Sequence, residues 1–111
     1  MAGLELEFGL SARVLNDLRA AFAAYPEIEQ VLIFGSRAKG TFKDGSDIDL
    51  AVFAPTMSTV RFAELWDRLD ALPLVFKLDV LHWHTLGNER LKEKITVEGK
   101  VFYSIEQMAK A

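Results

Sequence analysis

Three aspartates stand where strand-like patterns would bring carboxylates together. Asp47 and Asp49 are two residues apart at the start of an apolar run, so strand alternation places both side chains on one face. Asp79 is an isolated acid between Leu78 and Val80 in a later apolar run. Like charges this close repel unless a cation lies between them. Because Mg²⁺ takes one or two carboxylates and completes its shell with water and phosphate oxygens, the three acids predict a magnesium site.

The ordinary alternative for Asp47 and Asp49 is a pair of solvated acids at a strand entrance. Residues 50–53 argue against it, because this apolar stretch puts Asp49 at the edge of the core. With Asp79 on a neighbouring strand, the site is expected to hold two Mg²⁺ ions, which lower the pKa of an attacking hydroxyl and neutralise a leaving pyrophosphate. We expect Asp47 and Asp49 to bridge both ions and Asp79 to hold the ion that activates the acceptor, without a separate protein base.

A segment with phosphate-binding character precedes these acids. Gly35 and Gly40 are spaced as in a P-loop, but Thr41 and Phe42 occupy the positions of its lysine and its metal-binding hydroxyl. The P-loop interpretation therefore fails on residue chemistry. What remains is Gly35 with Ser36, a turn after a strand where backbone N–H groups can meet an anion without interference from a Cβ atom.

Several other polar residues have two interpretations. Arg37, Lys39 and Lys43 follow the Gly-Ser turn and are expected either to clamp a triphosphate or to be solvated loop cations. His82 and His84 have the spacing of a shared metal face. Since no third ligand is evident beside them, we interpret them as strand-end histidines satisfied by water or backbone.

A small sheet must bring these residues together. Apolar periodicity predicts strands at residues 31–34, 48–53 and 75–83, and helices from Ser11 to before Pro26, at 59–72 and at 86–98. The crossover through residues 59–72 makes the second and third strands parallel, whereas the turn-rich connection between the first two favours antiparallel pairing. Residues 101–103 either close the core or contact a partner, and we expect them to close the core. The predicted class is α+β, a small mixed sheet of three core strands backed by helices.

Composition narrows the class of protein. The 111 residues are expected to form one domain, and half of them are hydrophobic, including eight Phe. The lack of cysteine excludes thiol nucleophiles and zinc ribbons. A net charge of -3 disfavours a long nucleic acid as partner. Because no segment resembles a membrane span or a signal peptide, we expect a cytoplasmic protein without membrane contact.

Together these residues resemble the nucleotidyltransferase superfamily of DNA polymerase β, and within it the minimal nucleotidyltransferases, called MNT. The signature of this family is Gly-Ser, ten residues, D-x-D and a third acid on a later strand. Every signature position is filled here: Gly35, Ser36, Asp47, Asp49 and Asp79. The similarity runs from FGLS at residues 8–11 to the G-x-x-F-Y ending at residues 99–103, which is nearly the whole chain.

The resemblance implies Mg²⁺-dependent transfer of AMP from ATP to a hydroxyl, with release of pyrophosphate. It places the triphosphate on Ser36 and the adjacent amides. It also implies an antitoxin that acts on a tyrosine of a helical HEPN toxin. Two alternatives stay open: a module with an idle metal site that neutralises a HEPN partner by contact, and a small-molecule nucleotidyltransferase of the aminoglycoside type. The complete set of three carboxylates favours the enzyme.

Overall fold

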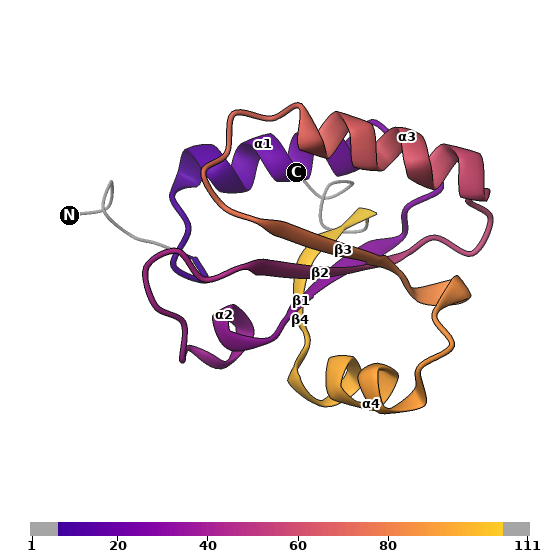
Figure 1. Ribbon diagram of the computed structural model, residues 1–111. Helices are drawn as coiled ribbons and strands as arrows, with labels where there is room; N and C mark the ends of the chain where they lie inside the picture. Colours follow the sequence, from indigo (N-terminus) through magenta and orange to yellow (C-terminus); the bar gives the residue numbers. More distant parts are fainter. Residues whose placement is uncertain (1–6, 106–111) are drawn as a thin grey trace.

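The computed structural model describes residues 7–105, and in this part of the chain helices pack on both faces of one sheet (Figure 1). The elements in chain order are α1 (Ala12–Ala23), β1 (Gln30–Phe34), α2 (Ser36–Lys39), β2 (Ile48–Phe53), α3 (Thr59–Asp70), β3 (Leu78–His82), the 3₁₀ turn η2 (Trp83–Thr85), α4 (Glu89–Glu98) and β4 (Lys100–Ser104). The strand order is β3-β2-β1-β4. The predicted α+β class with a small mixed sheet is confirmed.

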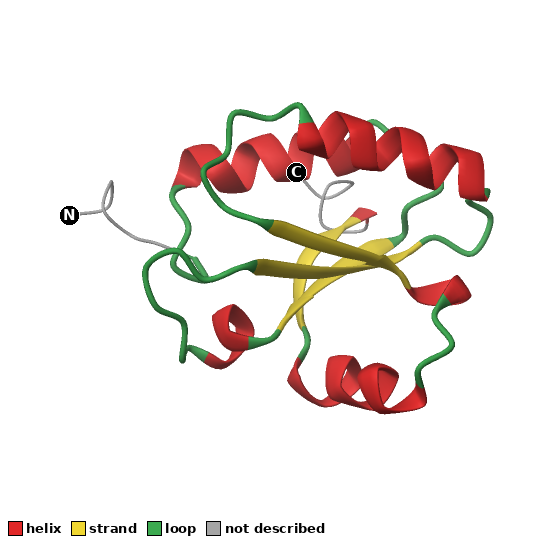
Figure 2. Ribbon diagram, viewed as in Figure 1, coloured by secondary structure: helices red, strands yellow, loops and turns green. Residues whose placement is uncertain are grey.

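The pairing of the strands follows from their connections. β1 pairs antiparallel with β2, and β2 pairs parallel with β3, both as expected. The parallel pair is joined through α3, which crosses one face of the sheet before the chain returns to it (Figure 2).

A fourth strand was not among the three expected ones. β4 pairs antiparallel with β1 and contains the apolar residues 101–103. The expected core closure is confirmed, because Phe102 and Tyr103 are only 1% and 5% exposed. So short an apolar run does not reveal a strand by itself, since its pairing partner β1 lies far earlier in the chain.

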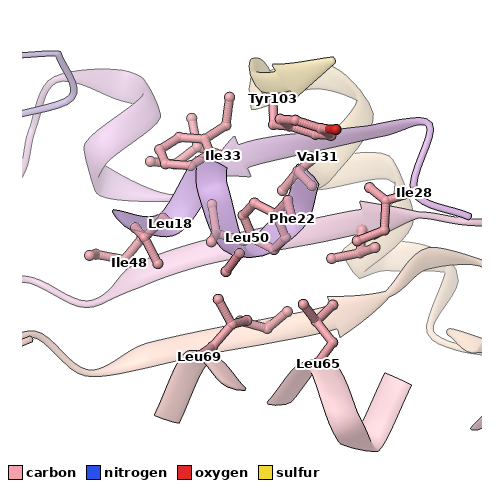
Figure 3. Packing of buried hydrophobic residues seen from close by; sticks show 14 of the residues in the cluster. Leu18, Phe22, Ile28, Val31, Ile33, Ile48, Leu50, Leu65, Leu69 and Tyr103 are labelled. Atoms are coloured by element: carbon pink, nitrogen blue, oxygen red, sulfur yellow. The ribbon is translucent and has the colours of Figure 1, made fainter. Parts of the chain in front are cut away.

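The two faces of the sheet bury different sets of residues. On one face α1 and α3 cover the larger cluster, in which Leu18 and Phe22 of α1 and Leu65 and Leu69 of α3 point toward the sheet (Figure 3). On the other face Ile95 of α4 packs with a smaller cluster. Alternation along β2 divides its side chains between the two clusters, as its sequence pattern predicts.

Two elements begin later than expected. The third strand begins at Leu78 rather than residue 75, because its pairing with β2 starts opposite Ile48, and Val75 before it is 94% exposed. The last helix begins at Glu89 rather than residue 86, because the side chain of Asn88 caps it by accepting from the Leu91 amide at 3.1 Å.

The other helices keep their expected starts. Ser11 caps α1 and Ser58 caps α3, each through its side-chain oxygen. α3 ends at Asp70, slightly before the expected Leu72. Because the longest helices have 12 residues, no helix in residues 7–105 is long enough to cross a membrane.

We predict that Phe102→Ala lowers the free energy of unfolding by about 3–5 kcal/mol, because it empties a fully buried ring site that contacts Phe8 and Phe22. The matched control is Val101→Ala, since Val101 is the preceding residue on the same strand and is 44% exposed. It should cost no more than about 1 kcal/mol. Urea unfolding measures both, and equal small losses would contradict the place of β4 in the core.

Candidate active site

The register of the sheet brings two of the predicted acids side by side. Asp49 of β2 lies directly opposite Asp79 of β3 in the parallel ladder, so their side chains share one face. This is the face that Ala51 shares with Ile95 of α4. Asp47 stands just before β2 and is exposed, as Asp79 is, whereas Asp49 is half-buried. The expectation that Asp49 and Asp79 lie on neighbouring strands and face the same way is confirmed.

The charges of this group act on Asp49. Burial raises the pKa of the Asp49 carboxyl, and the negative charges of Asp79 and Asp47 raise it further. The charge of Lys94 on α4 opposes them. Asp79 and Asp47 are therefore both close enough to Asp49 to make its ionisation less favourable.

Lys94 was missed by the sequence reasoning. It stands three residues after the inward Leu91 and four before Glu98, and residues at these spacings share one side of a helix. Glu98 in turn lies 3.7 Å from the Nζ atom of Lys39 on α2. The available signal in the sequence was the position of Lys94 on the same side of the predicted helix as the inward Leu91.

The donor set suits a hard cation such as Mg²⁺. In residues 7–105 no three Asp, Glu, His or Cys side chains converge closely enough to form a complete metal site by themselves. Mg²⁺ does not require that, because it usually takes one or two carboxylates and fills its shell with water and phosphate oxygens. The carboxylates of Asp49 and Asp79 lie on one face of neighbouring strands, and a cation that relieves their repulsion fits this arrangement.

Gly35 makes room for the Asp49 carboxylate. Its backbone has φ 76° and ψ -156°, a conformation essentially restricted to glycine. A Cβ atom built on Gly35 would overlap Oδ2 of Asp49. Residue 34, just before the glycine, pairs with Asp49 in the antiparallel ladder. The Gly-Ser turn is thus packed against the acid on which the predicted metal site depends.

Ser36 follows this glycine and begins α2, which ends after one turn at Gly40 with φ 81°. Ser36 is partly exposed. So short a helix is unlike the long one that follows a P-loop, in agreement with the rejection of that interpretation. The role of Gly35 and Ser36 in holding phosphate stays a prediction.

The basic residues after the turn have different surroundings. Arg37 is 3% exposed, and its guanidinium donates to the backbone carbonyls of Phe8 and Ser46, so its interpretation as a solvated loop cation is wrong. Lys39 is exposed and makes the long ion pair with Glu98 described above. Lys43 is exposed in the loop before β2.

The two histidines lie at the far end of β3. His82 is buried, its Nε2 is 3.1 Å from the carbonyl oxygen of Ala54, and its ring stacks on Phe62. A backbone partner for this histidine was expected and is confirmed. His84 packs edge-on against the ring of Phe53.

We predict that Asp49→Asn stabilises the metal-free protein by a few degrees in melting temperature, since relief of about 1 kcal/mol shifts a domain of this size by ~4–8 °C. A raised pKa in the folded state means that ionisation of Asp49 opposes folding. The stability gap should close near pH 3.8, the ordinary value, and open as the pH rises through the raised pKa.

Melting curves in EDTA from about pH 3 to about pH 8 measure this gap, because that window begins below the ordinary pKa of 3.8 and extends well above it. Asp67→Asn is the control, because Asp67 is exposed on α3 across the sheet and should change little. A variant at Asp49 that is less stable than the parent at neutral pH would contradict the prediction.

We predict that Gly35→Ala is more destabilising than Gly45→Ala. The two glycines have φ of 76° and 83°, which costs an alanine about 1–2 kcal/mol, but a Cβ atom at Gly45 meets no atom within 4 Å. At Gly35 the overlap with Asp49 adds to this cost. Removing that carboxylate in the Asp49→Ala background should therefore reduce the Gly35→Ala penalty, and unfolding of the four proteins as a double-mutant cycle measures the coupling. Additive effects would show that the two residues do not compete for space.

Comparison with known proteins finds a family that matches this chain. The family described as polymerase beta nucleotidyltransferase matches residues 16–108, most of the chain. No curated protein matches.

Solved structures of similar fold include several toxin–antitoxin proteins. One is a toxin–antitoxin with AMP-PNP, with a TM-score of 0.66 and 24% identity over 86% of this chain and 77% of that chain. Another, a mutant of the toxin–antitoxin MntA-HpeT, has a TM-score of 0.60 and 25% identity over 88% and 75%. A third is a tri-AMPylated Shewanella oneidensis HEPN toxin in complex with MNT antitoxin, at 0.56 and 22% over 88% and 72%. With a family match over most of its length, and with Asp49 and Asp79 side by side on its sheet, the chain belongs to the polymerase β nucleotidyltransferase family.

Proposed function

We propose that this chain acts as an antitoxin that transfers AMP from ATP to a hydroxyl of a HEPN toxin, with Mg²⁺ bound at its three aspartates. The observation that carries the proposal is the register of β2 and β3, which sets Asp49 beside Asp79, next to the Gly35–Ser36 turn. An acidic metal site and a phosphate-facing turn are the two parts that nucleotidyl transfer requires. Family membership supports the reaction class.

The aspartates would hold the metal. Asp49 and Asp79, which lie opposite each other, would supply oxygen ligands together with Asp47, and the triphosphate would supply the others. When bound, Mg²⁺ lowers the pKa of the acceptor hydroxyl and neutralises the charge that develops on pyrophosphate. The mutual repulsion of the carboxylates disfavours the empty site and so favours the cation.

The remaining parts of the site bind and orient ATP. The backbone at Gly35 lacks a Cβ atom, and with the Ser36 hydroxyl it is proposed to hold the triphosphate against the acids. Lys39 is half exposed and its contact with Glu98 is long, so it remains available to a phosphate oxygen. Lys94 adds positive charge from the α4 side.

The transfer itself exchanges one phosphorus–oxygen bond for another. The acceptor oxygen attacks the α-phosphorus, the bond from that phosphorus to the β-phosphate oxygen breaks, and pyrophosphate leaves with the electron pair. The proton of the hydroxyl passes to water. Of the two acids on the paired strands, Asp79 is the more exposed. We propose that the acceptor approaches from the side of Asp79.

The partner is inferred from the similar structures. A Shewanella oneidensis HEPN toxin is described as tri-AMPylated in complex with its MNT antitoxin, and a related toxin–antitoxin was solved with AMP-PNP. The protein proposed as substrate here is therefore a HEPN protein encoded beside this chain, with a tyrosine as acceptor.

Incubation of both proteins with ATP and Mg²⁺ tests the proposal by intact mass. We expect the HEPN protein to gain the mass of AMP less water, once or several times, and peptide mapping to place it on tyrosine. Asp49→Asn should slow the transfer by about 100-fold or more, because it removes a charge on which the transition state depends. EDTA should abolish the transfer and added Mg²⁺ should restore it.

Asp67→Asn serves as the control and should transfer AMP at the parent rate. A tight complex in which the HEPN protein keeps its mass would overturn the enzyme and favour neutralisation by contact. Modification of an aminoglycoside, with the HEPN protein unchanged, would favour a small-molecule enzyme instead.

A further inference from the structure

The buried guanidinium of Arg37 contacts three separate loops, two through hydrogen bonds to backbone carbonyls and one through the ring of Phe76. Nε and Nη2 of Arg37 both donate to the Ser46 carbonyl, at 3.2 and 3.0 Å, and Nη1 donates to the Phe8 carbonyl at 3.0 Å. Nη1 is also 3.5 Å from the Gly9 carbonyl oxygen. Arg37 stands on α2, directly after the Gly-Ser turn. The turn and these loops are therefore tied by one side chain.

Two aromatic rings complete the environment of this side chain. The guanidinium carbon lies 5.1 Å from the ring centre of Phe42 and 4.9 Å from that of Phe76. Such contacts partly replace the water that a buried cation loses. Burial lowers the pKa of Arg37, but guanidinium remains charged at neutral pH. The guanidinium of Arg37 thus uses its charge and its several N–H donors on backbone carbonyls and aromatic rings.

The loops held by Arg37 are those that lead into the acid-bearing strands. Ser46 immediately precedes Asp47, and Phe76 stands three residues before Asp79. Ser46 is held from the other side as well, because its Oγ accepts from the Lys43 amide at 2.8 Å. Movement of the Ser46 carbonyl would therefore be transmitted directly to Asp47.

The N-terminal turn at Phe8 and Gly9, which Arg37 also contacts, has a strained backbone. Phe8 has φ 57°, which is rare for a bulky residue, and Gly9 follows with φ 73°. These residues form a tight turn closed by the Leu10 amide, which donates to the Glu7 carbonyl at 2.9 Å. Since Arg37 binds the carbonyl of Phe8 itself, it helps to hold this turn against the phenyl ring of Phe42.

We propose that Arg37 is a positioning residue, which holds Ser46 and hence Asp47 in register with the Gly35–Ser36 turn and with the start of β3. It acts through backbone carbonyls and makes no contact with the triphosphate. This inference rests on the proposed function for its effect on catalysis, but not for its effect on the loops. The rival assignment, direct binding of phosphate by Arg37, requires an accessible guanidinium, whereas 3% of this residue is exposed.

Arg37→Lys tests the assignment, since lysine keeps the charge and loses the fork that reaches several carbonyls. We expect kcat for AMP transfer to fall by about 10- to 100-fold, because small misplacement of a catalytic group has effects of this size. The dissociation constant of ATP measured in EDTA should change little, because metal-free binding does not depend on Asp47. Direct phosphate binding predicts the reverse, a weaker ATP complex in EDTA.

Hydrogen exchange of the free protein provides a readout that needs no activity. The Ile48 amide donates to the Lys77 carbonyl at 2.9 Å, at the point where β2 and β3 begin. In Arg37→Lys the Ser46 and Ile48 amides should exchange about tenfold faster or more, while amides of β4 keep the parent rate. Absence of AMP transfer in the parent would overturn the proposed function alone, and this exchange would still decide the role of Arg37.

Arg19→Lys is the matched control. Arg19 also donates to a backbone carbonyl, that of Phe102 at 2.8 Å, and also lies over a ring, that of Phe102 at 4.9 Å. It binds Glu7 at the same N-terminal turn but not the loops before the acids. We expect it to lower stability without changing kcat or exchange at Ser46. Equal effects of both variants, or faster exchange throughout the chain in Arg37→Lys, would overturn the positioning role.

Discussion

The parallel pairing of β2 with β3 is the constraint on which the rest of the structure depends. It sets Asp49 opposite Asp79 on one face, and parallel neighbours in register cannot turn their side chains to opposite faces. Burial and two negative neighbours raise the pKa of Asp49, so the fold keeps a carboxylate where ionisation is unfavourable. A cation would remove that cost, which is the physical sense in which this site is built to bind one.

Burial of apolar side chains on the opposite face of the sheet offsets the cost of keeping Asp49 at this position. Leu50 follows Asp49 on the same strand and is fully buried in the cluster beneath α1 and α3. Because strand side chains alternate, the apolar cluster fixes the register of β2, and a one-residue slip would turn its hydrophobic residues to solvent. The core thus specifies the position of the acids through the backbone they share.

Two residues adapt the backbone around the acids. Gly35 leaves the space that the Asp49 carboxylate fills. Arg37, two positions later, ties the Ser46 carbonyl, just before Asp47, to the Phe8 carbonyl of the N-terminal turn. One residue acts by having no side chain and the other through a long, forked one. Ser36 stands between them, so the proposed phosphate contact lies between two fixed points of the chain.

The amino-acid sequence determined the strand pattern of residues 48–53, the shared face of Asp49 and Asp79, the Ser11 cap and the family resemblance, because all follow from local periodicity or fixed spacing. It did not reveal β4, whose partner β1 is distant in the chain, or the late start of β3, which pairing with β2 decides. Nor did the sequence show that Arg37 is buried whereas Lys39 is exposed. Both are cations after the same turn, and only the convergence of three loops around one of them buries its guanidinium and gives it carbonyl partners.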